Sequence, residues 1–229
     1  MAAASGFPDT VAPPLTWRKQ DWAYHHLRDW ILHGVLSPGQ RIDQEGLATH
    51  LGISRIPLRQ ALGRLVSEGL VLDRPHHGSI VTPVSLADAR DIYAGREALE
   101  MLLSRAAAGL ATEVDVDEVA DLLSQQEAAV DAGDFVTARQ LDQRFHNRIY
   151  AAAAMPRTLD ALAQLRTLSD RYLALYLSDP TRNRTSIQEH HAIVDALRRG
   201  DAEDIAQATG DHVRHGWQVL QVLLTEPDI

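Results

Sequence analysis

The sequence predicts a mainly α-helical protein, in which an N-terminal winged helix-turn-helix precedes a C-terminal antiparallel α-helical bundle. Three observations support this fold class. Apolar residues recur at helical spacing over most of the 229 residues. Strand-like segments occur as one short pair within residues 70–82. Residues 1–82 contain 8 Lys/Arg and 7 Asp/Glu, whereas residues 83–229 contain 14 and 24, which indicates two domains with different partners.

The composition excludes several classes of protein. The 45% hydrophobic content is enough for a substantial core. The chain has no cysteine, which excludes disulfides, thiolate zinc sites and cysteine nucleophiles. Residues 1–16 lack a basic segment and an apolar run, so we expect a disordered tail there and no signal peptide or membrane anchor. These features predict a cytoplasmic protein that does not bind membranes.

Residues 17–53 predict two helices separated by a turn. The first helix is expected over residues 17–33, where apolar residues form one stripe. A turn follows at Pro38 and Gly39. A short second helix is expected over residues 44–50, and Gly52 ends it.

A third helix follows directly and carries exposed positive charge. Ser54 is a suitable N-cap, and Pro57 in the first turn removes no helical hydrogen bond. Arg55, Arg59 and Arg64 lie off the buried stripe. Positive charge at the start of a helix is unfavourable to the macrodipole, so these arginines are expected to meet an anion, either phosphate or a guanine edge.

Residues 70–72 and 79–82 predict two strands joined by a turn, DRPHHG, with Arg74, His76 and His77 near its tip. Such a hairpin after a helix-turn-helix forms a wing. A helical packing module with solvated arginines is the alternative interpretation of residues 17–83.

The run PGQRIDQEGLATHLGISRIPLRQALGRLVSEGLVLDRPHHGSIVTP resembles the winged helix-turn-helix of the GntR family of bacterial transcription regulators. The resemblance implies a homodimer that binds a palindromic double-stranded operator and acts as a repressor. Ile56 departs from the small or hydroxylated residue found in many members, and it could contact a thymine methyl or narrow the choice of operator. The residues that the resemblance places on the operator are Ser54, Arg55 and Arg59 in the helix and His77 and Gly78 in the wing.

From Leu86 onward every segment has helical periodicity, which predicts about six helices in an antiparallel bundle. The expected organisation is therefore a tail at 1–16, a winged helix-turn-helix domain at 17–83 and an all-helical effector-binding and dimerisation domain at 84–229. The predicted helix breaks fall near residues 112, 133–134, 155–156, 179–183 and 200–201.

The segment LDQRFHNRIY, residues 141–150, places Asp142 and His146 one helical turn apart beside an apolar stripe. Two later helices carry His190 at the centre of one apolar stripe and His212 within another, whereas His191 lies about a quarter-turn off. Buried polar groups must be hydrogen-bonded, paired or metal-bound. Spacing alone leaves open hydrogen-bonded core histidines and a site where three imidazoles and one carboxylate hold a divalent transition metal.

Residues 87–110, LDQRFHNRIY, EHHAIVDALRRGD and the late His212 resemble the helical ligand domain (FCD type) of the FadR-type branch of the same family. One subset of that branch binds a divalent metal through an aspartate and three histidines. The pattern falls on Asp142, His146, His190 and His212, although a small change of helix phase would exchange His190 for His191. Nitrogen and oxygen ligands accept zinc, which we expect first, and also nickel, manganese or cobalt.

Arg96 falls within the apolar stripe of its helix, where an unpaired guanidinium is costly. It can pair with Glu100 four residues later, or it can hold a carboxylate effector beside the metal. Together, the two domains predict a ligand-responsive transcription regulator. A metal-dependent hydrolase is the alternative, but the sequence contains no G-x-S-x-G, H-E-x-x-H or glycine-rich phosphate loop.

Overall fold

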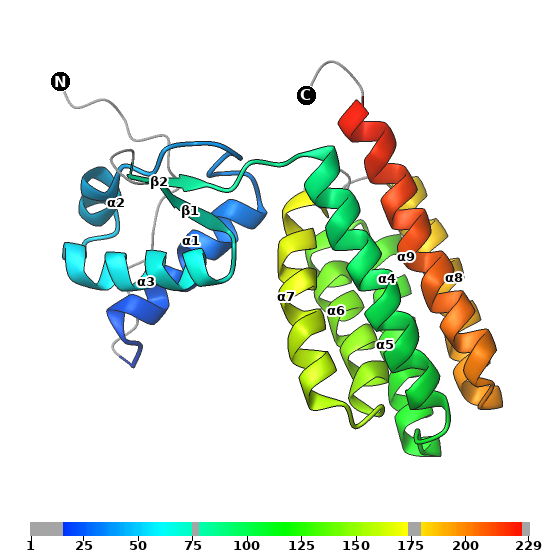
Figure 1. The fold of residues 1–229 in the computed structure, drawn as a ribbon. Coiled ribbons are helices and arrows are strands. Elements are labelled where there is room, and N and C mark those ends of the chain that lie inside the picture. The colour runs from blue at the N-terminus through cyan, green and yellow to red at the C-terminus, as the bar shows by residue number, and fades with distance from the viewer. Residues whose placement is uncertain (1–15, 75–77, 174–179, 226–229) are drawn as a thin grey trace. The chain divides into compact units, whose positions relative to one another are not determined.

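The computed structural model describes residues 16–74, 78–173 and 180–225. These residues form two compact units, one within Met1–Val84 and the other within Ser85–Ile229 (Figure 1). Residues 1–15 of the predicted tail and the wing residues His76 and His77 lie outside the described part. No helix in the described part is both long and apolar enough to cross a membrane.

The first unit contains three helices and one antiparallel hairpin. Gly52, at φ +62°, makes the turn between the second and third helices, a backbone conformation that glycine adopts without strain. In the hairpin Val71 pairs with Val81 and Arg74 with Gly78, and Arg41 adds an isolated bridge to Ile80. The elements are α1 (Lys19–Leu32), α2 (Gln44–His50), α3 (Arg55–Ser67), β1 (Val71–Arg74) and β2 (Gly78–Val81).

The core of the first unit forms where the apolar stripes of its helices meet. Leu27 of α1 and Leu58 and Leu65 of α3 are completely buried. Ser54 occupies the N-cap position of α3, as predicted, but its side chain makes no capping hydrogen bond. The Ser54 hydroxyl therefore does not cap the backbone amides at the start of α3.

The second unit is a helical bundle, and the predicted fold class is confirmed for the described residues. Helix α4 packs against α7 and α9, and α5 packs against α6 and α8. Four of the five predicted breaks separate observed helices, but the fifth, at 179–183, is wrong for residues 180–183, which form the start of α8 because proline is tolerated in the first turn of a helix. The helices are α4 (Leu86–Ala108), α5 (Glu113–Asp131), α6 (Phe135–Ala151), α7 (Pro156–Leu173), α8 (Pro180–Arg199) and α9 (Ala202–Thr225).

Helix α4 carries a line of buried polar residues at four-residue spacing, formed by Arg96, Glu100 and Ser104. The Ser104 hydroxyl lies 2.9 Å from that of Thr209 on α9, so the two helices are joined by a buried hydrogen bond. One residue further along α9, a Cβ added at Gly210 would come within 2.8 Å of the Met101 sulfur. The two helices therefore approach closely beside this polar line.

Candidate metal centre

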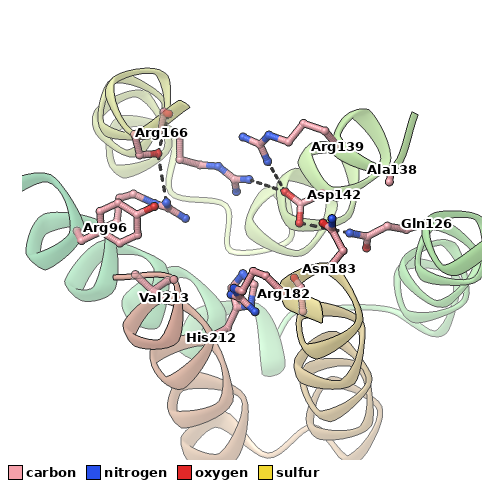
Figure 2. Close-up of a pocket in the computed structure, with 14 residues that line it drawn as sticks. Arg96, Gln126, Ala138, Arg139, Asp142, Arg166, Arg182, Asn183, His212 and Val213 are labelled. Atoms are coloured by element: carbon pink, nitrogen blue, oxygen red, sulfur yellow. Dashed lines mark hydrogen bonds and ion pairs between the residues drawn. The ribbon is translucent and has the colours of Figure 1, made fainter. Parts of the chain in front are cut away.

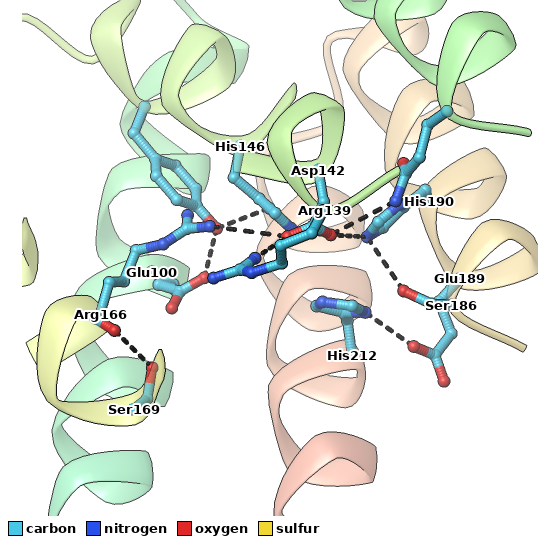
Figure 3. A network of polar contacts seen from close by, with 12 residues as sticks. Glu100, Arg139, Asp142, His146, Arg166, Ser169, Ser186, Glu189, His190 and His212 are labelled. Carbon is cyan, nitrogen blue, oxygen red and sulfur yellow. Dashed lines mark hydrogen bonds and ion pairs between the residues drawn. The ribbon is translucent and has the colours of Figure 1, made fainter. Parts of the chain in front are cut away.

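Three histidines from three helices meet inside the second unit (Figure 3). His146 lies on α6, His190 on α8 and His212 on α9. Each offers one ring nitrogen, and these nitrogens all lie within 4.8 Å of one another. The three residues are 1%, 0% and 8% exposed, respectively. The helical periodicity in the sequence had assigned all three to inward faces, and the fold brings them together.

The outward nitrogen of each ring, Nδ1, has a hydrogen-bond partner. Glutamine and carboxylate oxygens only accept, and the tyrosine hydroxyl donates its own proton to Glu100 at 2.5 Å. Each Nδ1 therefore carries a proton and donates it, which leaves Nε2 as the ring nitrogen available to a ligand. The distances are 3.2 Å from His146 to Tyr150, 3.0 Å from His190 to Gln126 and 2.7 Å from His212 to Glu189.

Asp142 lies beside two of the three rings. Its Oδ1 is 3.7 Å from Nε2 of His146 and 3.6 Å from Nε2 of His190. Its other oxygen pairs with Arg139. Burial opposes ionisation of this carboxyl, but Arg139 together with the neighbouring His190 and Arg166 outweighs it and holds the pKa of Asp142 at about 2. Asp142 is therefore an ionised oxygen donor at the edge of the histidine group.

The protonation states match those that a metal requires. Burial is the main cause that lowers the pKa of His146 well below its ordinary value and that of His190 to about 3, so both rings are neutral. Nε2 of His146 is buried without a hydrogen-bond partner in the described part of the chain. A buried lone pair beside two more imidazoles and a carboxylate fits a divalent transition metal.

Two neighbouring histidines lie elsewhere. His191 is about half exposed and lies 3.5 Å from Glu127. His215 is half exposed and donates to Glu189 at 2.9 Å. The structure therefore places His190, and not His191, in the group, and the same carboxylate that contacts His212 also contacts His215.

A cavity of about 80 Å³ adjoins the histidines and is lined by Asp142 and His212 together with several arginines (Figure 2). Helical periodicity in the sequence pointed to one of these arginines, Arg96, and gave no signal for the other three. Nη1 of Arg166 is buried and has no hydrogen-bond partner within the described residues. The lining is therefore rich in arginine and includes an unused donor, although the arginines also pair with nearby carboxylates. The arginines are Arg96, Arg139, Arg166 and Arg182.

Arg96 lines this cavity and is also paired. Its Nε donates to Glu100 at 2.8 Å and its Nη1 to Ser169 at 3.2 Å. Burial would raise the pKa of Glu100, but the charges of Arg96 and Arg166 lower it, so Glu100 is ionised. Arg96 therefore pairs with Glu100, as the first interpretation predicts, and it also borders the cavity. Its contact with an effector stays a prediction.

The candidate DNA contacts in the first unit lie on the exposed side of α3. Ser54, Arg55 and Arg59 are exposed, and Arg55 lies 2.7 Å from Glu45 of α2. A groove beside them is lined by Arg55, Arg59 and Gly78, the last at φ +75°. Ile56 between the two arginines is 72% exposed.

Arg64, the remaining predicted contact on α3, is engaged in packing. Its guanidinium lies 3.6 Å from the centre of the Tyr24 ring, and its Nε donates to Glu68 at 3.2 Å. Tyr24 also donates to Glu68. This side chain therefore joins α1 to the last turn of α3.

Comparison with known families gives two matches. Residues 91–215 match the FCD domain, and residues 19–81 match the gntR family of bacterial regulatory proteins. The chain is 27% identical over 191 residues to the HTH-type transcriptional repressor RspR of Escherichia coli, covering 83% of the chain and 84% of RspR. It is 31% identical over 195 residues to an HTH-type regulator in an unstable DNA locus of Streptomyces ambofaciens, covering 83% and 80%.

Solved structures give a consistent result. The structure of E. coli McbR/YncC superposes with a TM-score of 0.76 at 25% identity, covering 90% of this chain and 98% of that one. A regulator from Rhodococcus sp. RHA1 has a TM-score of 0.73 at 20% identity, covering 88% and 97%, which shows the shared fold.

Proposed function

The chain belongs to the GntR family of bacterial transcription regulators with an FCD domain, and we propose that this domain binds a divalent metal and a small carboxylate effector that together control operator binding. The resemblance noted from the sequence is thereby confirmed at the level of the family. The metal and the effector extend beyond that family assignment.

One observation carries the metal proposal. Three buried imidazoles each offer a ring nitrogen within 4.8 Å of the other two, while every Nδ1 has an outer hydrogen-bond partner. Metal-bound histidines in proteins are oriented in this way. His146, His190 and His212 would hold the ion, with Asp142 as the oxygen ligand. Zinc is expected first, then nickel, manganese or cobalt, and the bound ion would supply positive charge to an effector carboxylate.

The cavity supports a small anionic effector. Four arginines and one carboxylate, Asp142, stand among its described lining residues, although Arg96, Arg139 and Arg182 also pair with carboxylates outside the lining. Arg166 contributes a buried guanidinium nitrogen with no hydrogen-bond partner among the described residues, and such a group favours a carboxylate. The limited volume favours hydroxy- or dicarboxylates of a few carbons. Arg96 would contact the same effector through the side of its guanidinium that faces away from Glu100.

The proposed operator contacts are Ser54, Arg55, Arg59 and Gly78, together with His77, which lies outside the described residues. Arg64 is the weakest of the predicted contacts because Tyr24 and Glu68 already hold it. We expect a homodimer on a palindromic operator, since half-site symmetry mirrors protein symmetry. A repressor acting in the cytoplasm is the favoured role, as the name of the relative RspR suggests.

The test combines metal analysis with effector titration. Metal-loaded and chelated protein are titrated with a panel of small hydroxy- and dicarboxylates, and melting temperature and operator affinity are measured. We expect an active acid to change operator affinity about 5- to 150-fold, and only in metal-loaded protein. Arg166→Met should lose the response. Arg157→Met, an exposed arginine on the same helix, is the matched control. A response that survives chelation would overturn the proposed role of the metal.

A further inference from the structure

The last turn of α7 contains four consecutive buried polar residues. Ser169 is 1% exposed, Asp170 8%, Arg171 5% and Tyr172 0%. Consecutive residues on a helix face directions about 100° apart, so these side chains reach different neighbours. Buried polar groups are normally hydrogen-bonded, and the partners of these four include two sets, one at the effector cavity and one at the start of α4.

The first set of partners lines the effector cavity. Ser169 accepts a hydrogen bond from Arg96 at 3.2 Å. Asp170 pairs with Arg139, which also pairs with the candidate ligand Asp142. A metal bound by Asp142 competes with Arg139 for this carboxylate and leaves Arg139 to its pair with Asp170. An anionic effector that attracts Arg96 or Arg139 competes instead with Ser169 and Asp170 for the guanidinium groups.

The second set of partners lies at the start of α4. Arg171 donates to Asp88 at 2.9 Å, and the Tyr172 hydroxyl donates to the same oxygen at 2.5 Å. The backbone amide of Ser85 lies 3.3 Å from that hydroxyl as a donor. Burial and the hydrogen bond to Asp88 raise the pKa of Tyr172 to about 12, so its hydroxyl stays protonated.

Ser85 is the N-cap of α4 and the first residue of the second unit, so the chain enters here from the DNA-binding unit. One turn of α7 therefore contacts both residues that line the cavity and residues at the start of α4, where the chain enters the second unit. An occupant changes an equilibrium only through its different affinity for the two arrangements, and displacement at Ser169 and Asp170 would be carried to Arg171 and Tyr172 because they belong to the same turn.

We propose that residues 169–172 of α7 relay occupancy of the metal pocket to the N-terminus of α4 through the contacts of Arg171 and Tyr172 with Asp88 and Ser85. This relay rests on the proposed metal site. It assigns to Tyr172 a positioning role, because the side chain contacts neither the three histidines nor Asp142 in any described hydrogen bond.

The test is hydrogen exchange of the full-length protein with and without Zn²⁺. Amides of the first hydrogen-bonded turns of α4, residues 89–95, report local opening of this helix. In wild type we expect Zn²⁺ to slow their exchange by about 5-fold or more, the lower end of common coupling strengths. In Tyr172→Phe, which keeps the ring and removes the hydroxyl, the slowing should fall below about 2-fold, while α8 and α9 are still protected.

Two further variants sharpen the test. Asp88→Asn keeps the side-chain size, removes the charge, and should behave like Tyr172→Phe. Tyr24→Phe also deletes a hydroxyl bonded to a carboxylate, here Glu68 at 2.8 Å, but in the first unit, and should behave like wild type.

The outcomes separate the two proposals. Protection of α8 and α9 with no change at residues 89–95 in wild type, or equal protection of 89–95 in wild type and Tyr172→Phe, would overturn the relay alone. No Zn²⁺-dependent protection anywhere would overturn the metal site itself.

Discussion

Arg96 donates a hydrogen bond of 2.8 Å to Glu100 one helical turn along α4, and Glu100 is completely buried. Glu100 also accepts from Tyr150, whose hydroxyl is the partner of His146 Nδ1. A salt bridge within one helix therefore supports the orientation of a candidate metal ligand on another helix.

Arg96→Met is expected to lower the free energy of unfolding by about 3 kcal/mol, because it leaves the Glu100 carboxylate buried without its charge partner. Urea unfolding measures the change. Arg105→Met on the same helix removes a pair with Glu203 that is largely exposed, and should cost much less. Equal stability of the two variants would mean that Arg96 contributes little through Glu100, and its main role would then lie in the cavity.

Purified protein is expected to carry about one divalent metal per chain, and His146→Ala, His190→Ala and His212→Ala should each lose it. Elemental analysis of dialysed protein gives the stoichiometry. His191→Ala and His215→Ala are the matched controls, because these exposed neighbours lie outside the group of Nε2 atoms. Metal loss in His191→Ala with retention in His190→Ala would show that the ligand on α8 is the other neighbour.

Metal-free protein is expected to lose stability as the pH falls below about 6.5. The pKa of His190 is lowered from 6.5 to about 3 by burial, so the unfolded chain takes up a proton in this interval that the folded chain does not. The contribution of this histidine to the free energy of unfolding is therefore fully present above pH 6.5. It declines as the pH falls toward 3, by about 1.4 kcal/mol per pH unit for each such histidine.

Urea unfolding of chelated protein at several pH values between about 7 and 5 tests this slope. His190→Leu, which has no titratable group in either state, should give a flatter profile than wild type. His191→Ala should keep the wild-type slope, and parallel profiles for wild type and His190→Leu would refute the explanation.

Arg59→Ala is expected to abolish specific operator binding, because a bidentate contact to a base is worth about 1–3 kcal/mol. Arg55→Ala should weaken it. Arg64→Ala should leave operator affinity near that of wild type and instead lower the stability of the first unit, since its guanidinium packs on Tyr24. Gel-shift titrations at fixed salt measure the affinities. Wild-type affinity in Arg59→Ala would remove α3 as the recognition helix.

Helical periodicity predicted the fold class and the inward direction of the histidines, because burial of one face is a local property of the sequence. It also separated His190 from His191 by about a quarter-turn, and the structure buries the first and exposes the second. The role of Ser54 was harder to predict, because whether an N-cap side chain bonds the helix depends on its rotamer.

The rest of the site depends on partners distant in the sequence. Arg166 and Arg182 lie on polar flanks of their helices. From a single sequence, an arginine that lines a cavity at such a position cannot be distinguished from a solvated one. Gln126 and Glu189 are partners of His190 and His212 from positions 64 and 23 residues away. Only the packing of α5 against α8, and of α8 against α9, brings these groups together.

The buried polar line on α4 has a consequence for how the bundle can move. A slide of α4 along its neighbours by one turn, about 5.4 Å, would separate the Ser104 and Thr209 hydroxyls and move the Arg96 guanidinium away from Ser169. Each displaced group would lose a buried hydrogen bond. The register of α4 in the bundle is therefore fixed by its polar residues, and we expect the proposed regulation to tilt or slightly rotate this helix rather than to shift it along its axis.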